Sequence, residues 1–383
     1  MIRAPVNPGL LRWTRERAGI AQEDLTAKFK KLPAWEDGLT QPTLKQAEAF
    51  ARAVHAPVGY LFLSKPPEEA LPIPDFRTFA GRAVTRPSPN LLDMIYACQE
   101  RQSWYRDFAR VAGASDIDFV GSASVKTSPE TVAARMRETL GFDPDARREC
   151  PTWTDALRLF ICQADDAGVL VMVSGVVMSN SRRRLDPDEF RGFALCDPLA
   201  PLVFVNGRDT KAAQMFTLAH ELAHIWLGAS ALSNLGVAPR PGFRNEEVWC
   251  NAVAAELLVP LEALQSDLRR NEALPDALAR LARIFKVSTL VILRRLLDAG
   301  WLNRERFDTS WVQENQRLRK LAQAGSGGDF YRTTVARVGW RFTRALVVST
   351  LEGQTLYRDA FRMLGVRKTE TFNNLGREAG VMG

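Results

Sequence analysis

The stretch FTLAHELAHIWLG, from Phe216 to Gly228, is the most informative part of this chain. Its apolar residues recur at helical spacing, which predicts a helix with one buried side. His220 and His224 are four residues apart, so their imidazoles project from one helical face and can bind the same metal ion. Glu221 lies beside that face, where a carboxylate can accept a proton from activated water. The spacing predicts metal-assisted hydrolysis; the alternative is a helix with two structural histidines.

A zinc site of this kind needs at least three protein ligands. The third histidine of the chain, His55, is far away in the N-terminal part, so a carboxylate is expected instead. The segment 245–260, NEEVWCNAVAAELLVP, predicts a second helix that ends at its proline. Three carboxylates there are chemically suitable: Glu246, Glu247 and Glu256.

Two linked segments carry a resemblance to a known family. Residues 216–228 and the later E-x-x-x-N-x-x-A-A-E-L-L-V-P of residues 247–260 resemble the ImmA/IrrE family of metallopeptidases, also called M78 peptidases. The preceding FRGFALCDPLAPLVFVN, residues 190–206, is similar to the strand that leads into the metal helix of that family. The resemblance covers about residues 150–300 and implies a zincin-like α+β metallopeptidase domain.

The resemblance also implies roles for individual residues. The glutamate four positions before the asparagine is the third zinc ligand of the family, which gives His220, His224 and Glu247 as metal ligands and Glu221 as the catalytic residue. One Zn²⁺ per chain is implied, although Mn²⁺ or Fe²⁺ can occupy the same ligands. Asn251 lies one turn after Glu247 and is expected either to support a metal ligand or to pack between helices.

The sequence also suggests which groups stabilise the transition state and which strand aligns the substrate. Tyr331, Arg244 and the backbone of residues 193–206 are candidates for stabilising the transition state. An edge strand at residues 193–196 is expected to align an extended substrate by strand addition.

The N-terminal segment carries a second resemblance. Residues 10–25, LLRWTRERAGIAQEDL, and the later W-E-D-G at residues 35–38 resemble a Cro/C1-type (XRE) helix-turn-helix domain. In that family Gln22 begins the second helix and contacts a DNA phosphate. The recognition helix is short here, because only KFKKLPA separates Ala27 from Trp35, and it contains Pro33.

A short recognition helix presents few side chains to a major groove. Gln22 and the lysines Lys28, Lys30 and Lys31 are therefore candidate DNA contacts, mainly to phosphates. The alternative is a docking or dimerising module whose lysines are simply solvated.

The chain divides into four predicted parts: a helix-turn-helix domain at 1–65, a linker and helical connector at 66–150, the peptidase domain at 151–300, and a helical extension at 301–383. Apolar strands are predicted at 169–173, 193–196 and 202–206, between helices. The fold class is therefore mostly α with a small sheet, α+β. Within the extension, the tract 330–383 contains Arg332, Arg337, Arg341 and Arg344 beside apolar residues, which predicts an amphipathic basic helix with a solvated face. The alternative is that this face binds a partner or nucleic acid.

Composition restricts the cellular setting. The chain has 383 residues, of which 46% are hydrophobic and 25% charged, and its longest apolar run is too short to span a bilayer. From its first residues we expect no secretory leader. Its five cysteines form no C-x-x-C pair, which argues against a disulfide framework. We expect a cytoplasmic protein that does not bind membranes.

These patterns predict a zinc-dependent endopeptidase coupled to a helix-turn-helix domain. By resemblance, its protein substrate is a regulator such as a transcriptional repressor in stress response or mobile-element control, and DNA and a second copy of the chain are possible partners. The alternative is a non-proteolytic XRE-family transcriptional regulator or the antitoxin of a toxin-antitoxin pair. A third interpretation is an interaction scaffold.

Overall fold

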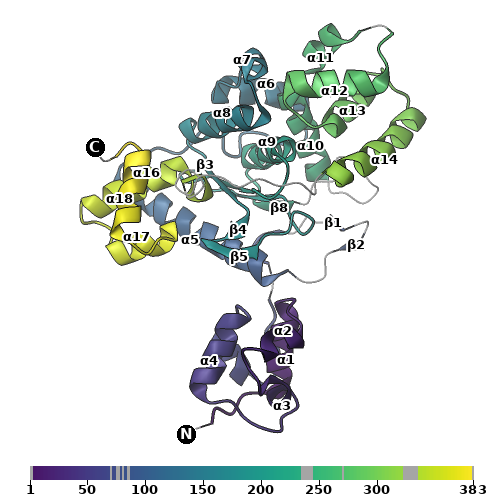
Figure 1. Ribbon diagram of the computed structural model, residues 1–383. Helices are drawn as coiled ribbons and strands as arrows, with labels where there is room; N and C mark the ends of the chain where they lie inside the picture. Colours follow the sequence, from purple (N-terminus) through teal and green to yellow (C-terminus); the bar gives the residue numbers. More distant parts are fainter. Residues whose placement is uncertain are drawn as a thin grey trace. The chain divides into compact units, whose positions relative to one another are not determined.

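The computed structural model describes residues 3–69, 71–74, 78–79, 82–83, 87–233, 245–269, 271–321 and 335–381. The chain divides into two compact units (Figure 1). One comprises residues 1–72 and 84–95, and the other comprises residues 73–83 and 96–383. The chain crosses between them after residues 72, 83 and 95, the last of these inside α5 (Pro89–Val111).

The first unit is a cluster of short helices. Its elements are α1 (Pro8–Arg17), α2 (Gln22–Thr26), α3 (Leu32–Glu36), α4 (Leu44–Ala53) and the 3-10 helix η1 (Val58–Phe62). Trp35 and Phe50 lie in its apolar core. Helix α4 begins with a capping box, in which Thr43 and Gln46 exchange hydrogen bonds.

Helix α3 is as short as the sequence suggests. It has five residues, and Pro33 lies in its first turn, where a missing N–H costs no helical hydrogen bond. The carboxylate of Glu36, which is buried at the end of α3, accepts hydrogen bonds from Arg15 at 2.8 Å and from Gln22 at 3.0 Å. These bonds tie the first three helices together.

The second unit contains a four-stranded mixed sheet, as the fold-class prediction requires. The strand order is β3-β7-β6-β8, with β3 and β7 parallel and the other pairs antiparallel. The strands are β3 (Leu170–Ser174), β6 (Gly192–Leu195), β7 (Leu202–Asn206) and β8 (Ala231–Ser233). Strands β6 and β7 are buried along their whole length, which explains their continuous apolar sequence.

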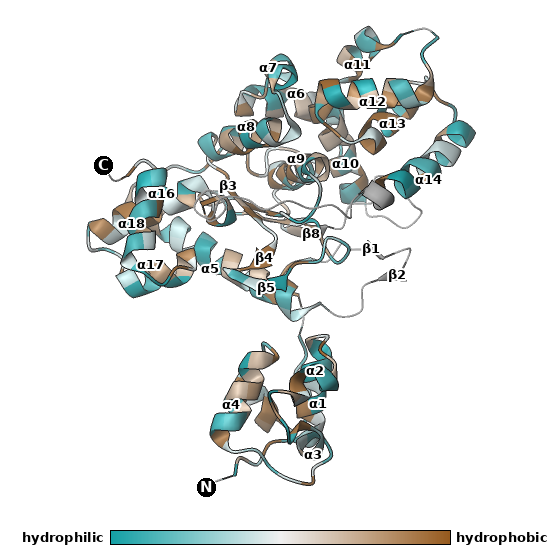
Figure 2. Cartoon of the chain, viewed as in Figure 1, coloured by the Kyte–Doolittle hydropathy of each residue, from teal (hydrophilic) through white to brown (hydrophobic). Residues whose placement is uncertain are grey.

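Helix α9 lies against β6 and β7 of this sheet, and the helices that follow it pack mainly on other helices (Figure 1). The helices of this part are α6 (Pro129–Leu140), α7 (Pro144–Glu149), α8 (Trp153–Asp166), α9 (Lys211–Leu227), α10 (Asn245–Leu258), α11 (Leu261–Asp267), α12 (Leu274–Phe285), α13 (Thr289–Asp298) and α14 (Arg304–Leu321). Figure 2 shows the apolar residues of α12 and α13 gathered on one side of each helix. These faces join one core with α9 and α10.

The C-terminal part contains α16 (Trp340–Leu351), α17 (Tyr357–Leu364) and α18 (Thr369–Glu378). In the described part of the tract, from residue 335 on, the predicted basic helix is interrupted, because Gly339 adopts φ +84° beside the Val171 carbonyl. Its basic face is not simply solvated either. Arg341 donates to the Asp165 carbonyl at 2.7 Å, and Arg344 donates to the Ala379 carbonyl at 3.1 Å. Arg332 lies outside the described residues.

Two small antiparallel pairs were not predicted from the sequence. They are β1 (Thr78–Phe79) with β2 (Arg82–Ala83), and β4 (Val176–Val177) with β5 (Asn180–Arg184). The mostly polar β5 lacks the apolar alternation that marks a half-buried strand. Within the described ranges, none of the helices combines the length and apolar character that a bilayer-spanning segment requires.

Candidate metal centre

Helix α9 carries the His-Glu-x-x-His segment. The Thr210 hydroxyl caps its first turn by accepting the Ala213 N–H, and Gly228 ends it in the left-handed conformation, at φ 72°. Every residue from Gln214 to Trp226 is buried, because α9 lies between the sheet and other helices. His220, Glu221 and His224 are each 0% exposed.

Helix α10 packs against α9 and brings Glu247 to the two histidines. Three arginines hold the C-terminal end of α10 by donating to its last carbonyls and to the carbonyl that follows. Arg137 bonds Glu256 O at 2.9 Å, Arg295 bonds Val259 O at 2.9 Å, and Arg147 bonds Leu258 O. Positive charge at this end complements the helix dipole and fixes α10 along its axis.

The donor atoms of three side chains converge. His220 Nε2 lies 3.1 Å from His224 Nε2 and 3.4 Å from Glu247 Oε2, and His224 Nε2 lies 2.9 Å from Glu247 Oε1. Tetrahedral zinc with bonds of about 2.0–2.1 Å holds its ligand atoms about 3.3 Å apart. The spacing of this cluster therefore fits a zinc ion, and the two-nitrogen, one-carboxylate donor set suits it chemically.

The surroundings also favour the protonation states that a metal requires. Burial lowers the pKa of His220, which favours the neutral imidazole. Burial opposes ionisation of Glu247, but hydrogen bonds from His220 and His224 stabilise its carboxylate, and the pKa of that carboxyl is lowered to about 2. A neutral imidazole and an ionised carboxylate are the metal-binding forms of these groups.

Glu221 lies next to the cluster on α9 and against strand β6. A Cβ at Gly192 would be 3.1 Å from Glu221 Oε1, 2.8 Å from Phe204 O and 2.6 Å from Thr217 Cγ2. The absence of a side chain at Gly192 is therefore what allows β6 to pack beside the carboxylate. Gly192 was not among the predicted site residues, although a glycine inside an apolar strand signals a close approach of this kind.

The other carboxylates considered as ligands lie elsewhere. Glu256 is buried and forms an ion pair with Arg295, so its negative charge is balanced by that arginine and not by a metal ion. Glu246 is partly exposed on the first turn of α10 and is not part of the cluster. Asn251 hydrogen-bonds His220, which raises the pKa of that imidazole against the effect of burial.

A thiol beside the site was also missed. Cys196 donates to the carbonyl of His224 at 3.5 Å, and burial, with a contribution from Glu221, raises its pKa to about 12. The thiol is therefore a neutral packing group in this structure. A cysteine directly after a predicted strand gives no sequence signal for such a contact.

The predicted edge strand is wrong. Strand β6 lies between β7 and β8, so both of its edges are paired, and β8 is outermost in the sheet order. The Leu232 N–H of β8 donates to Pro74 O at 3.0 Å. The sequence could not show this, because β8 is a three-residue strand with no alternating pattern.

The candidate DNA contacts lie in the first unit. Lys28, Lys30 and Lys31 are exposed between α2 and α3, whereas Gln22 is partly buried and donates to Glu36 at 3.0 Å. The transition-state candidates Tyr331 and Arg244 lie outside the described residues.

Comparison with known proteins adds to this geometry. Residues 164–297 match a peptidase M78 family model described as "IrrE N-terminal-like domain". The chain is also 36% identical over 106 residues to a "Radiation response metalloprotease IrrE" from Deinococcus deserti. That match covers 27% of this chain and 38% of the relative, so the chain spans well under half of the relative's length.

The C-terminal part has its own match. Residues 338–378 match a family model described as "Domain of unknown function (DUF8813)", which covers α16 to α18. For residues 164–297, which contain the His220, His224 and Glu247 cluster, the comparisons support the ImmA/IrrE (M78) family of metallopeptidases.

Proposed function

We propose that this protein is a zinc-dependent endopeptidase with one metal ion per chain. The observation that carries the proposal is the buried cluster of His220, His224 and Glu247, whose donor atoms are spaced as the corners of a zinc coordination tetrahedron. Glu221 supplies a carboxylate beside that cluster. A zincin-type hydrolase needs both features.

The residues of the site have three roles: metal binding, proton transfer and positioning. His220, His224 and Glu247 hold the metal, which when bound supplies a Lewis acid that polarises the scissile carbonyl and acidifies water. Glu221 accepts the proton of the attacking water and passes it to the leaving amine. Asn251 orients the His220 ring, and the absence of a side chain at Gly192 leaves room for the Glu221 carboxylate beside β6.

The proposal also names a class of substrate. A relative named for a radiation response supports a regulatory role, so the substrate we propose is a regulatory protein such as a transcriptional repressor in stress response or mobile-element control. Cleavage would relieve repression. The setting that we propose for this reaction is the cytoplasm.

The first unit is proposed to be a helix-turn-helix module. Supporting features are the succession of short helices α1 to α4 and the exposed Lys28, Lys30 and Lys31. If the module binds DNA, its affinity should fall steeply with salt, because lysines meet phosphates. A non-proteolytic XRE-type regulator or antitoxin remains the competing interpretation, and self-association through this unit is part of it.

The first experiment is elemental analysis of the full chain, purified without a histidine tag and without added metal. About one zinc per native chain is expected, with a large loss in Glu247→Ala and none in Glu246→Ala, the neighbouring control. A native chain that contains no metal and takes up none from added zinc would refute the proposal.

A second variant separates chemistry from metal binding. Glu221→Gln should retain zinc and lose peptide cleavage by about 10²–10⁴-fold, the usual contribution of a positioned acid–base group. A Glu221→Gln chain that retains every cellular activity would show that proteolysis is not the function and would favour the regulator.

A further inference from the structure

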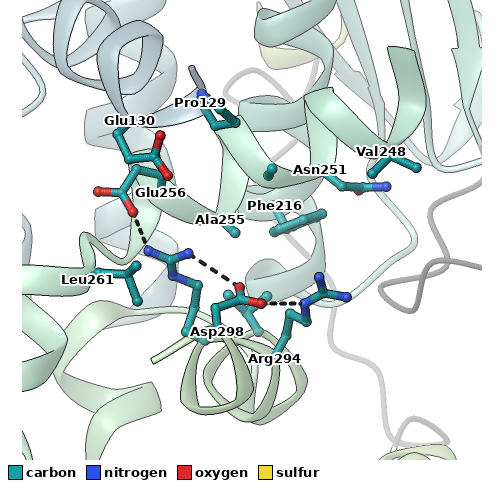
Figure 3. A pocket seen from close by; sticks show the side chains of 13 residues that line it. Pro129, Glu130, Phe216, Val248, Asn251, Ala255, Glu256, Leu261, Arg294 and Asp298 are labelled. Carbon is teal, nitrogen blue, oxygen red and sulfur yellow. Dashed lines mark hydrogen bonds and ion pairs between the residues drawn. The ribbon is translucent and has the colours of Figure 1, made fainter. Parts of the chain in front are cut away.

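A pocket of about 320 Å³ opens between helices α6, α9, α10 and α13 (Figure 3). It lies next to the metal centre, because three lining residues are neighbours of the cluster. Phe216 is one turn before His220, Val248 follows Glu247, and Asn251 hydrogen-bonds His220. The pocket therefore borders the segments of α9 and α10 that carry the metal ligands.

The lining of the pocket combines apolar and charged side chains. Its apolar residues include Phe216, Ala252 and Ala255, and Val291 of α13. The volume is at the small end of the range for ligand pockets, about 300–1,000 Å³. Such a site suits one long side chain with an aliphatic stem and a polar end.

The residues that line the pocket include three carboxylates and two arginines, so one carboxylate has no arginine to match it. Arg295 is 4% exposed and bonds Glu256 with one guanidinium nitrogen and Asp298 at 3.4 Å with another. Arg294 donates to Asp298 at 2.9 Å. Figure 3 shows these bonds joining both arginines to carboxylates. Two arginines are thus matched by two acids.

The remaining carboxylate is that of Glu130. Its side chain is exposed at the start of α6, and within the described part of the chain it has no ion pair. The N-terminal end of a helix favours the ionised form of a carboxylate. An acidic substrate side chain would meet this charge unfavourably, whereas a basic one would pair with it.

We propose that this pocket is a substrate subsite that accepts an arginine or lysine side chain next to the scissile bond, with Glu130 as the residue that selects it. The inference rests on the proposed peptidase function and deepens it by naming a substrate class. The apolar walls hold the aliphatic stem, and Glu130 pairs with the guanidinium or ammonium group.

The test profiles cleavage of a random peptide library by the zinc-loaded full chain, with cleavage sites identified by mass spectrometry. We expect arginine and lysine to be enriched at one fixed position beside the cleaved bond. Glu130→Lys should abolish that enrichment and favour aspartate or glutamate there. Glu138→Lys, an exposed charge reversal on the same helix outside the pocket, should leave the preference unchanged.

A binding measurement gives a result that does not depend on turnover. With the full-length Glu221→Gln chain, Nα-acetyl-arginine methylamide should bind about tenfold more tightly than its neutral citrulline analogue, because the citrulline side chain loses the charged hydrogen bond. Glu130→Gln should remove this difference.

The outcomes distinguish the two proposals. Cleavage without a basic preference, or with a preference that survives Glu130→Lys, overturns the subsite and leaves the peptidase intact. A zinc-loaded chain that cleaves no library peptide refutes the peptidase and the subsite together. Equal binding of the arginine and citrulline probes overturns the role of Glu130 on its own.

Discussion

Replacing Gly192 by alanine is expected to damage both the stability and the chemistry of the second unit. The added Cβ would lie 2.6 Å from Thr217 Cγ2 and 2.8 Å from the Phe204 carbonyl oxygen, and both distances are shorter than real contacts allow. The carbonyl belongs to the paired strand β7 and cannot move without distorting the sheet. Overpacking of this kind costs about 1–3 kcal/mol, and two close contacts place Gly192→Ala toward the upper end, about 2–3 kcal/mol.

The same methyl group would lie 3.1 Å from Glu221 Oε1, so the carboxylate must shift by a few tenths of an ångström or more. A small misplacement of a reacting group can cost up to about 100-fold in rate. None of the three atoms nearest to the added Cβ belongs to a metal ligand, so zinc content should remain near one per chain. Loss of activity with retained metal is therefore the expected combination.

The assays are urea unfolding followed by circular dichroism, zinc analysis, and the rate of library cleavage. Gly59→Ala is the matched control, because a Cβ there has no atom within 4 Å and its backbone is not in the left-handed region. A Gly192→Ala chain that unfolds at the wild-type urea concentration and cleaves at the wild-type rate would refute the close packing of β6 against Glu221.

Two further predictions concern the stability of the second unit. Arg295→Met should destabilise it by about 3 kcal/mol in urea unfolding, because Glu256 is left buried without its cation. The control, Arg304→Met, breaks an exposed pair with Asp308 and should cost less than about 1 kcal/mol. Equal losses of stability in the two variants would contradict the burial of the Arg295–Glu256 pair. Burial raises the pKa of Asp165 from 3.8 to about 6, so between these pH values the folded state binds a proton that the unfolded state releases. The stability that this proton contributes is fully present below pH 3.8 and is lost as the pH rises through 6. Between pH 7 and 4.5 the wild type should therefore gain about 2 kcal/mol relative to Asp165→Asn, and parallel pH profiles of the two proteins would exclude this contribution.

Much of the candidate site follows from local spacing in the sequence. Histidines four residues apart share a helical face whatever surrounds them, so the spacing alone pairs His220 with His224. The strands at β3, β6 and β7 are visible as apolar runs, because a strand buried on both faces has no polar alternation. The α+β fold class follows from these runs and the helical periods between them.

Tertiary packing decided the rest. Sequence chemistry left Glu246, Glu247 and Glu256 open, and the family resemblance pointed to Glu247. The placement of α10 against α9 brings Glu247 to the histidines, and Glu256 pairs with Arg295 instead. The pairing of β6 on both edges depends on the short strand β8, which has no pattern of its own.

By itself, then, the sequence determined the metal-binding helix and the α+β class, because both depend on periodicity along the chain. The tertiary structure decided which carboxylate faces the histidines, why Gly192 must lack a side chain, and which charges in the pocket beside the metal centre are already paired. Those properties depend on distances between residues far apart in sequence, and no local pattern encodes such distances.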